Sequence, residues 1–143
     1  MTTVAQIIRA KRTTATYTIS PEASVFEAIG LMAEKNIGAL VVTEGEAVVG
    51  TITERDYARK IILLSRSSKE TPVRAAMSSP VVSVRPGQTN EECMALMTEK
   101  RVRHLPVIDK GRLIGIVSIG DLVKDIIAEQ QFTIQQLEHY IAG

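Results

Sequence analysis

Two segments of the sequence place a hydroxyl residue three positions before an aspartate, directly after an apolar run. The first segment is Gly50-Thr51-Ile52-Thr53-Glu54-Arg55-Asp56, and the second is Gly115-Ile116-Val117-Ser118-Ile119-Gly120-Asp121. A hydroxyl and an acid at this spacing predict a helix N-terminus that caps itself. The same N-terminus offers free N–H groups to a phosphate, and the aspartate offers oxygens to ribose hydroxyls. Capping and ligand binding are compatible, and both interpretations stay open.

A basic pair, Arg103 and His104, directly precedes an apolar run that lies a few residues before the second of these segments. An arginine can bind two phosphate oxygens at once, and a histidine can add another donor. The alternative is a solvated basic helix end that complements the helix dipole. The first repeat has Gly38 and Ala39 at the matching positions, which carry no charge, so we expect two unequal sites.

No arrangement typical of an enzyme is present. The two histidines are far apart in sequence, and there is no P-loop and no G-x-G-x-x-G motif. Cys93 is the single cysteine and lies on an apolar helix stripe, which favours a buried structural thiol over a redox role. His139 has no neighbour at metal-ligand spacing. We therefore expect no catalytic residues, no metal and no catalytic cofactor.

The elements that must position these residues are duplicated. A shift of 65 positions aligns residues 18–57 with 83–122 without a gap, and 10 of the 40 pairs are identical. Chance would give roughly two or three identities at average composition. The identical pairs include Pro21/Pro86, Glu27/Glu92, Gly50/Gly115 and Asp56/Asp121. An internal duplication explains this similarity.

Each repeat reads as β-α-β-β-α. Capping boxes at Ser24 and Thr89 open the first helix of each repeat, and turns at Gly45 and Gly111 indicate hairpins. A closing helix begins near Thr53 or Ser118. The predicted strands are Thr16–Ile19, Ala39–Thr43 and Val48–Ile52 in the first repeat, and Val81–Val84, Leu105–Ile108 and Leu113–Val117 in the second.

We predict an α+β fold in which the two modules pack sheet against sheet with pseudo-twofold symmetry, because one repeat is too small to bury its own sheet. The expected organisation is a first module over residues 1–64, a linker over 65–70, a second module over 71–128 and a C-terminal helical tail over 129–143. Thr71–Met77 reads as a short helix that introduces the second module. Gln130–Ile141 reads as a separate amphipathic stretch.

The repeated pattern G-h-h-[ST]-x-x-D (h, apolar), within two β-α-β-β-α copies, resembles the cystathionine-β-synthase (CBS) domain family over residues 1–128. Residues 53–59 and 101–106 resemble a subgroup of stand-alone CBS pairs. The resemblance implies a disc-like pair that usually dimerises, with clefts between modules that bind AMP, ADP, ATP or, in some members, NAD or S-adenosylmethionine. It assigns ribose to Asp56 and Asp121, and phosphate to Thr53, Ser118, Arg103 and His104.

The resemblance also suggests where an adenine ring would lie, although apolar core positions fit the same pattern. The candidates are Thr16 to Thr18, Val81 to Ser83, Ile37, Ala39 and Pro106, of which Thr18, Ser83, Ala39 and Pro106 join the site list. Arg55 either adds phosphate charge or pairs with a nearby glutamate. Lys11 and Arg12 could cap a phosphate tail. Arg59 and Lys60 read as surface charges.

We therefore expect a non-catalytic sensor that binds an adenine nucleotide and transmits its ligand state to an unknown effector protein. The alternatives are a structural dimerisation protein with empty clefts and an enzyme with an unusual site. A net charge of +1 and the absence of long apolar runs argue against nucleic-acid and membrane partners. No signal peptide is evident, so we expect a cytoplasmic protein, with organelle import as an alternative. The apolar tail favours a homodimer or partner surface.

Overall fold

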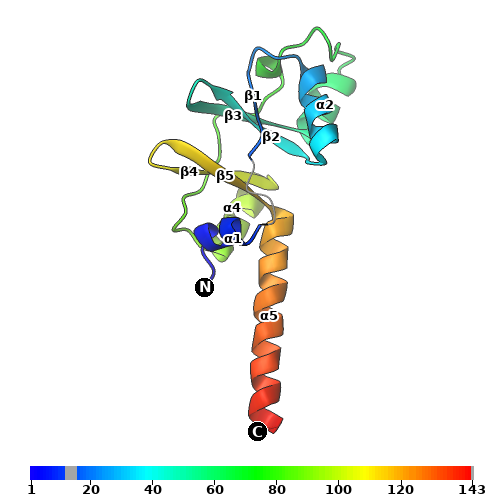
Figure 1. Cartoon of the computed structure of the whole chain (residues 1–143). Helices are drawn as coiled ribbons and strands as arrows, with labels where there is room; N and C mark the ends of the chain where they lie inside the picture. Colours follow the sequence, from blue (N-terminus) through cyan, green and yellow to red (C-terminus); the bar gives the residue numbers. More distant parts are fainter. Residues whose placement is uncertain (12–15, 143) are drawn as a thin grey trace. The chain divides into compact units, whose positions relative to one another are not determined.

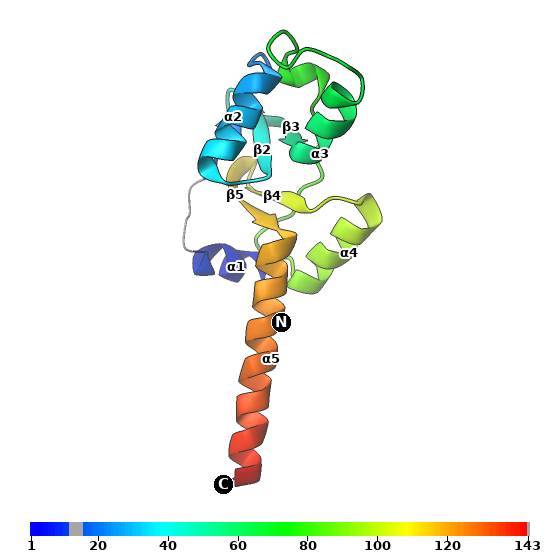
Figure 2. The same ribbon diagram turned by 90° about the vertical axis from the view of Figure 1, so that its right-hand side faces the viewer.

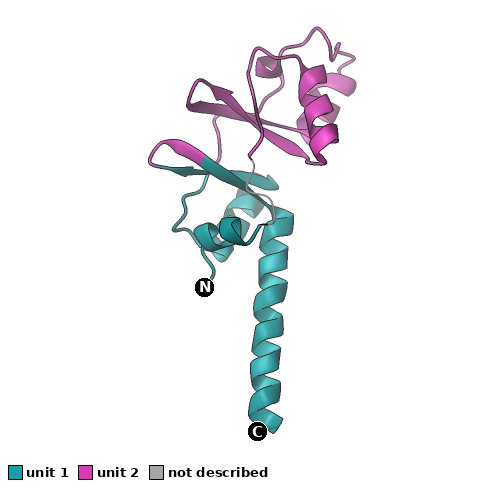
Figure 3. Ribbon diagram, in the orientation of Figure 1, with its two compact units in different colours: residues 1–14, 83–109, 114–143 teal, residues 15–82, 110–113 magenta. Residues whose placement is uncertain are grey.

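The computed structural model describes residues 1–11 and 16–142 and has a mixed α+β architecture, as predicted (Figure 1). The chain folds into two compact units (Figure 3). Unit 1 contains Met1–Thr14, Ser83–Asp109 and Ile114–Gly143, and unit 2 contains Ala15–Val82 and Lys110–Leu113. The elements are α1 (Val4–Ala10), β1 (Thr18–Ile19), α2 (Val25–Lys35), β2 (Ala39–Glu44), β3 (Ala47–Thr53), α3 (Glu54–Tyr57), α4 (Asn90–Lys100), β4 (His104–Asp109), β5 (Arg112–Ser118) and α5 (Ile119–Ala142).

Unit 2 is a three-stranded sheet, in the order β1-β2-β3, with helices packed on an apolar face. The hydroxyl of Ser24 caps α2 by accepting the Glu27 N–H at 3.1 Å, as the sequence predicted. A π-helical turn, Ala58–Ile62, follows α3. Side chains of α2 and of the π-helical turn pack against β2 and β3. This core contains Val25, Ala28, Met32, Leu40, Val42, Ile52 and Ile61.

Unit 1 repeats this plan with one strand fewer. Thr89 caps α4, and β4 and β5 form the hairpin, with Gly111 in the turn at φ +80°. The expected strand Val81–Val84 is wrong, because only Val84 pairs, in a single parallel bridge to Val107. Val84 donates to the Pro106 carbonyl, and the preceding bond of that ladder would need an N–H that Pro106 lacks. Pro106 therefore shortens the strand.

The C-terminal tail is not a separate element. α5 is a single helix of 24 residues that begins directly after β5 (Figures 1 and 2). Beyond Gly120, no glycine or proline interrupts the chain before residue 143, so nothing in the sequence ends the helix earlier. Its first turns pack against α1 and α4. Among the described residues, no helix combines the length and apolarity needed to cross a membrane.

The segment that precedes each repeat packs within the compact unit of the other repeat. Thr3, which caps α1, forms a bridge to Thr89, and Val4 donates to the Gln88 carbonyl at 2.8 Å. In the same way, Pro72 forms a bridge to Ser24. The helix expected over Thr71–Met77 is only a 3₁₀ turn, Val73–Ala75.

A backbone ladder and an ion-pair cluster hold this second segment in unit 2. Thr51 and Ser78 exchange backbone hydrogen bonds of 3.1 and 2.8 Å. Arg74 contacts Glu22 and Glu44 at 2.7 and 2.6 Å, and hydrogen bonds from these two carboxylates raise the pKa of its guanidinium. Residues 72–78 therefore fold as part of unit 2.

The two equivalent glycines, Gly50 and Gly115, should differ in their tolerance of a side chain. A Cβ on Gly50 would lie 2.9 Å from the Ser78 carbonyl oxygen, whereas a Cβ on Gly115 would meet only the flexible Ile8 side chain, at 3.1 Å. We expect Gly50→Ala to lower the free energy of unfolding by about 1–3 kcal/mol and Gly115→Ala by clearly less. Urea denaturation of both variants measures this. Equal losses would contradict the close backbone approach.

Candidate functional site

In unit 1, the hydroxyl–aspartate pair lies where β5 becomes α5. The Ser118 N–H donates to Asp121 Oδ2 at 2.8 Å, and the Asp121 N–H donates to Ser118 Oγ at 3.2 Å. This reciprocal pair of hydrogen bonds is the predicted capping arrangement. It places a carboxylate at the N-terminus of a long helix.

Lys11, at the end of α1, supplies the positive charge beside this carboxylate. Its Nζ lies 3.0 Å from Asp121 Oδ2 and donates to the Ile116 carbonyl at 2.8 Å. The side chains of Lys11 and Asp121 are 25% and 15% exposed, so water still reaches the pair. The sequence places Lys11 near a phosphate tail, whereas in the structure it pairs with Asp121, the candidate ribose residue. Arg12, named with it, lies outside the described residues.

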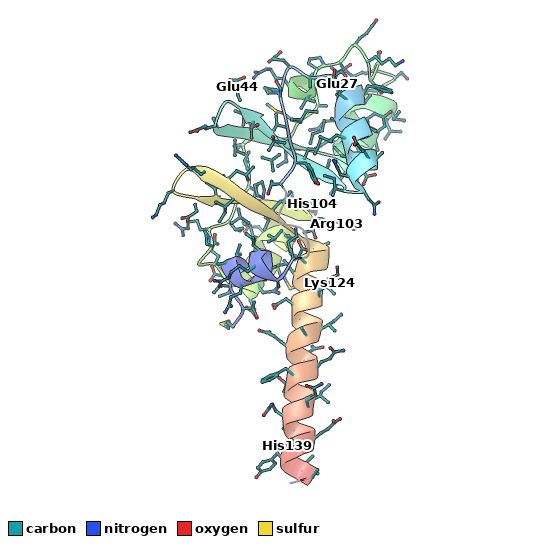
Figure 4. The ribbon with its side chains drawn as sticks, in the orientation of Figure 1. Glu27, Glu44, Arg103, His104, Lys124 and His139 are labelled. Atoms are coloured by element: carbon teal, nitrogen blue, oxygen red, sulfur yellow. The ribbon has the colours of Figure 1, made fainter. Side chains whose placement is uncertain are left out.

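Arg103 and His104 lie beside the same helix start. The Ile119 N–H donates to the Arg103 carbonyl at 2.9 Å, which joins the first residue of α5 to the residue before β4 (Figure 4). Arg103 is exposed and His104 is half-buried. Ser83 is exposed next to Val84, which bonds to the carbonyl of the buried Pro106. Arg103 is thus joined to the start of α5, and Ser83 precedes the residue that pairs with β4.

In unit 2, Thr53 and Asp56 form the equivalent cap. Asp56 Oδ2 accepts the Thr53 N–H at 3.0 Å and the Thr53 hydroxyl at 3.1 Å. The Asp56 N–H donates back to Thr53 Oγ1 at 3.1 Å. Asp56 is only 8% exposed. Ala39 is the register partner of Thr53, and Thr18 lies on the neighbouring edge strand opposite Val41.

Two further residues occupy the other oxygen of this carboxylate. Ser78 Oγ donates to Asp56 Oδ1 at 2.9 Å, and Lys60 Nζ lies 3.2 Å from the same oxygen. Lys60 also donates to the Ala76 carbonyl at 3.0 Å. Lys60, whose side chain is 39% exposed, therefore lies at the surface but pairs with Asp56 instead of being a solvated charge. Its i,i+4 spacing from Asp56 was the available signal, whereas nothing in the sequence linked Ser78 to Asp56.

The two aspartates consequently differ in how fully they are occupied. Both oxygens of Asp56 are bonded by residues of its own unit. Among the described residues, Asp121 uses Oδ2 for its side-chain contacts. Arg55 is exposed in the first turn of α3.

A hollow of about 240 Å³ lies on unit 2 beside the end of α2. Its lining residues are Ile29, Met32, Ala33, Asn36, Ile37, Gly38 and Glu54. It contains Ile37 from the adenine candidates, but not Thr53 or Asp56. No group of three or more potential metal ligands occurs within the part of the chain that the structure describes.

Cys93 is buried in α4, in agreement with the structural interpretation. Burial raises the pKa of its thiol to about 11. The thiol therefore stays protonated near neutral pH, where only the thiolate is a good nucleophile.

Comparison with known proteins identifies the class. The model of the CBS domain matches residues 4–63 and 73–128, so the chain belongs to the CBS-domain family and carries two such domains in tandem. A CBS-domain protein of Burkholderia ambifaria MC40-6 is 58% identical, with a TM-score of 0.87 and coverage of 93% of this chain and 99% of that one.

Two other relatives extend the comparison. The mitochondrial CBS domain-containing protein CBSX3 of Arabidopsis thaliana is 44% identical over 84% of this chain, and the match spans 61% of the longer plant protein. A hexameric CBS-CP12 protein from bloom-forming cyanobacteria is 30% identical, with a TM-score of 0.76 over 85% of this chain and 70% of that one. CBS pairs of this kind are regulatory modules.

The different occupation of the two aspartates predicts different costs of their removal. Asp56→Ala leaves Thr53, Ser78 and Lys60 without their acceptor, so we expect the free energy of unfolding to fall by about 2–3 kcal/mol. Asp121→Ala should cost about 1 kcal/mol, because fewer described groups lose their acceptor. Urea unfolding, followed by circular dichroism, measures both. A larger loss for Asp121→Ala would contradict the described contacts.

Proposed function

We propose that this chain is a non-catalytic regulatory module that binds an adenine nucleotide at its hydroxyl–aspartate positions and transmits the ligand state to a protein partner. The ligand class is AMP, ADP, ATP or NAD. The observation that carries this proposal is the group formed by Ser118, Asp121 and Lys11 at the start of α5, next to Arg103. This group combines ribose acceptors with phosphate donors.

Groups of opposite charge would contact the ribose and the phosphate of the nucleotide. Asp121 is an acceptor for ribose hydroxyls, and the N-terminus of α5 offers N–H groups to phosphate. Arg103 and His104 add cationic or neutral donors on the adjoining strand. Lys11 neutralises the carboxylate before the ligand arrives, which reduces repulsion between Asp121 and a phosphate.

The first-repeat position is a weaker site in this proposal. Asp56 is already bonded by Thr53, Ser78 and Lys60, and Gly38 and Ala39 replace the basic pair. We therefore propose unequal occupancy, with one nucleotide bound tightly per chain. Thr53, Arg55, Asp56, Thr18 and Ala39 would form the weaker position. Ser83 and Pro106 would adjoin the stronger one.

The regulatory part of the proposal rests on the family. The Burkholderia ambifaria relative is described as a candidate signal-transduction protein, and the cyanobacterial relative is hexameric. We propose that this chain acts as a homodimer. A nucleotide can change the output only if it binds two states of the chain with different affinity.

The direct test is titration calorimetry of the full chain with AMP, ADP, ATP and NAD. We expect a stoichiometry close to one for the tight phase. Arg103→Ala should weaken binding by about 1.5–3 kcal/mol, or roughly 10- to 150-fold, because a charge-assisted hydrogen bond to phosphate is lost.

Arg112→Ala is the matched control, since it removes the same charge from the opposite end of the same hairpin. It should leave the affinity unchanged. Equal effects of the two variants would contradict the assignment of Arg103. If none of the four nucleotides gives a binding heat at millimolar concentration, the proposed sensor is overturned and a structural dimerisation protein remains.

A further inference from the structure

α5 exposes a narrow apolar seam that runs from its first turns into its C-terminal half. Val123, Ile127, Ile134, Leu137 and Ile141 are between 42% and 83% exposed. Figures 1 and 2 both show this half of the helix extending beyond α1 and α4, the elements that cover its first turns. Within the described part of unit 1, nothing shields these side chains from water.

The seam follows a heptad repeat. Ile127, Ile134 and Ile141 are seven residues apart, and Val123 and Leu137 lie at the intervening d-type positions, with Gln130 between them. Positions a and d therefore recur at alternating spacings of four and three residues, which is the pattern of a coiled coil. A helix that packs on an ordinary globular surface needs a wider apolar stripe than this.

The residue types select a second copy of the same helix. Isoleucine occupies all three a positions and Leu137 one of the three d positions, and isoleucine at a with leucine at d favours a parallel two-stranded coiled coil. A twofold axis along the seam would place Gln130 opposite Gln130 of the second copy, so that the two amides could bond each other. An apolar partner would leave this amide unpaired in the contact. Gln130 therefore fixes the register in which two copies of the helix pair.

The charges of the helix agree with this partner and disfavour a membrane. Residues 125–142 contain Asp125, Glu129 and Glu138 and no lysine or arginine. A helix that lies on an anionic lipid surface normally carries a basic polar face. In a parallel pair, the flanking e and g positions bring Thr133 near Glu138 and create no like-charge contact. Phe132 lies on the opposite side of the helix and is not part of the seam.

The geometry points to a parallel, in-register coiled coil between the α5 helices of two copies, formed by Val123, Ile127, Gln130, Ile134, Leu137 and Ile141. This inference deepens the homodimer part of the proposed function by naming its contact surface. The segment from Ile127 to Ile141 spans about 21 Å of helix. The packing of its first turns in unit 1 starts the helix, so the seam needs no separate nucleation.

Disulfide trapping in the full chain tests the register. Leu137→Cys should form a covalent dimer under mild oxidation, since a d-position cysteine faces its own copy. Gln136→Cys, one residue away on the outer side, is the matched control and should stay monomeric on a non-reducing gel. The unaltered chain controls for Cys93, which is buried and has a thiol pKa of about 11. Equal trapping of the two variants would overturn the seam.

Sedimentation equilibrium, without nucleotide, separates this inference from the wider proposal. We expect Ile134→Glu to raise the dimer dissociation constant at least 100-fold, Phe132→Glu to leave it unchanged and Gln130→Leu to lower it about 10-fold. Circular dichroism checks that all three variants keep their helix content. A dimer that survives Ile134→Glu would overturn the seam but keep the homodimer. A monomeric unaltered chain would overturn both, and nucleotide binding would still stand or fall on its own calorimetry.

Discussion

Val4 and Val73 are both fully buried, and each lies in a segment that precedes one repeat and packs in the unit of the other. This exchange is the constraint on which the candidate sites depend. The bridges from Thr3 to Thr89 and from Pro72 to Ser24 attach the leading segments to the caps of α4 and α2. They determine which side chains reach each aspartate.

The consequence is a different electrostatic setting at two positions that share one sequence pattern. In unit 2, the exchanged segment delivers the neutral hydroxyl of Ser78, and Lys60 of the local helix supplies the charge. In unit 1, the exchanged segment delivers the charge itself, through Lys11. The carboxylate of Asp121 is therefore coupled to the N-terminal segment, while the buried carboxylate of Asp56 is bonded by Thr53, Ser78 and Lys60.

The proposed nucleotide site and the proposed contact with a second copy lie along one helix, α5. Its first turn holds the candidate ligand residues, and its first turns are covered by α1 and α4. The apolar seam runs along the same helix from Val123 to Ile141. A rigid helix would carry a change at Asp121 to a contact with a second copy, which is the kind of link a regulatory module requires. The continuity of the helix makes this link possible, and a hinge after residue 128 would remove it.

The repeats, both helix caps, the hairpins and the hydroxyl–aspartate junctions followed from the sequence, because each depends on residues within a few positions of one another. The asymmetry between Arg103 and Gly38 was also visible there. Local patterns could not predict the contacts of Lys11 or Ser78, which meet their partners across 110 and 22 positions.

Local sequence patterns also missed the loss of the strand at Val81. That loss depends on the N–H that Pro106 lacks in the backbone hydrogen bonds between β4 and the segment ending at Val84. The chain by itself thus determined the parts and their order, through spacing and capping. Only the tertiary structure decided which leading segment completes which repeat, because that choice is made by burial and hydrogen bonding between distant residues.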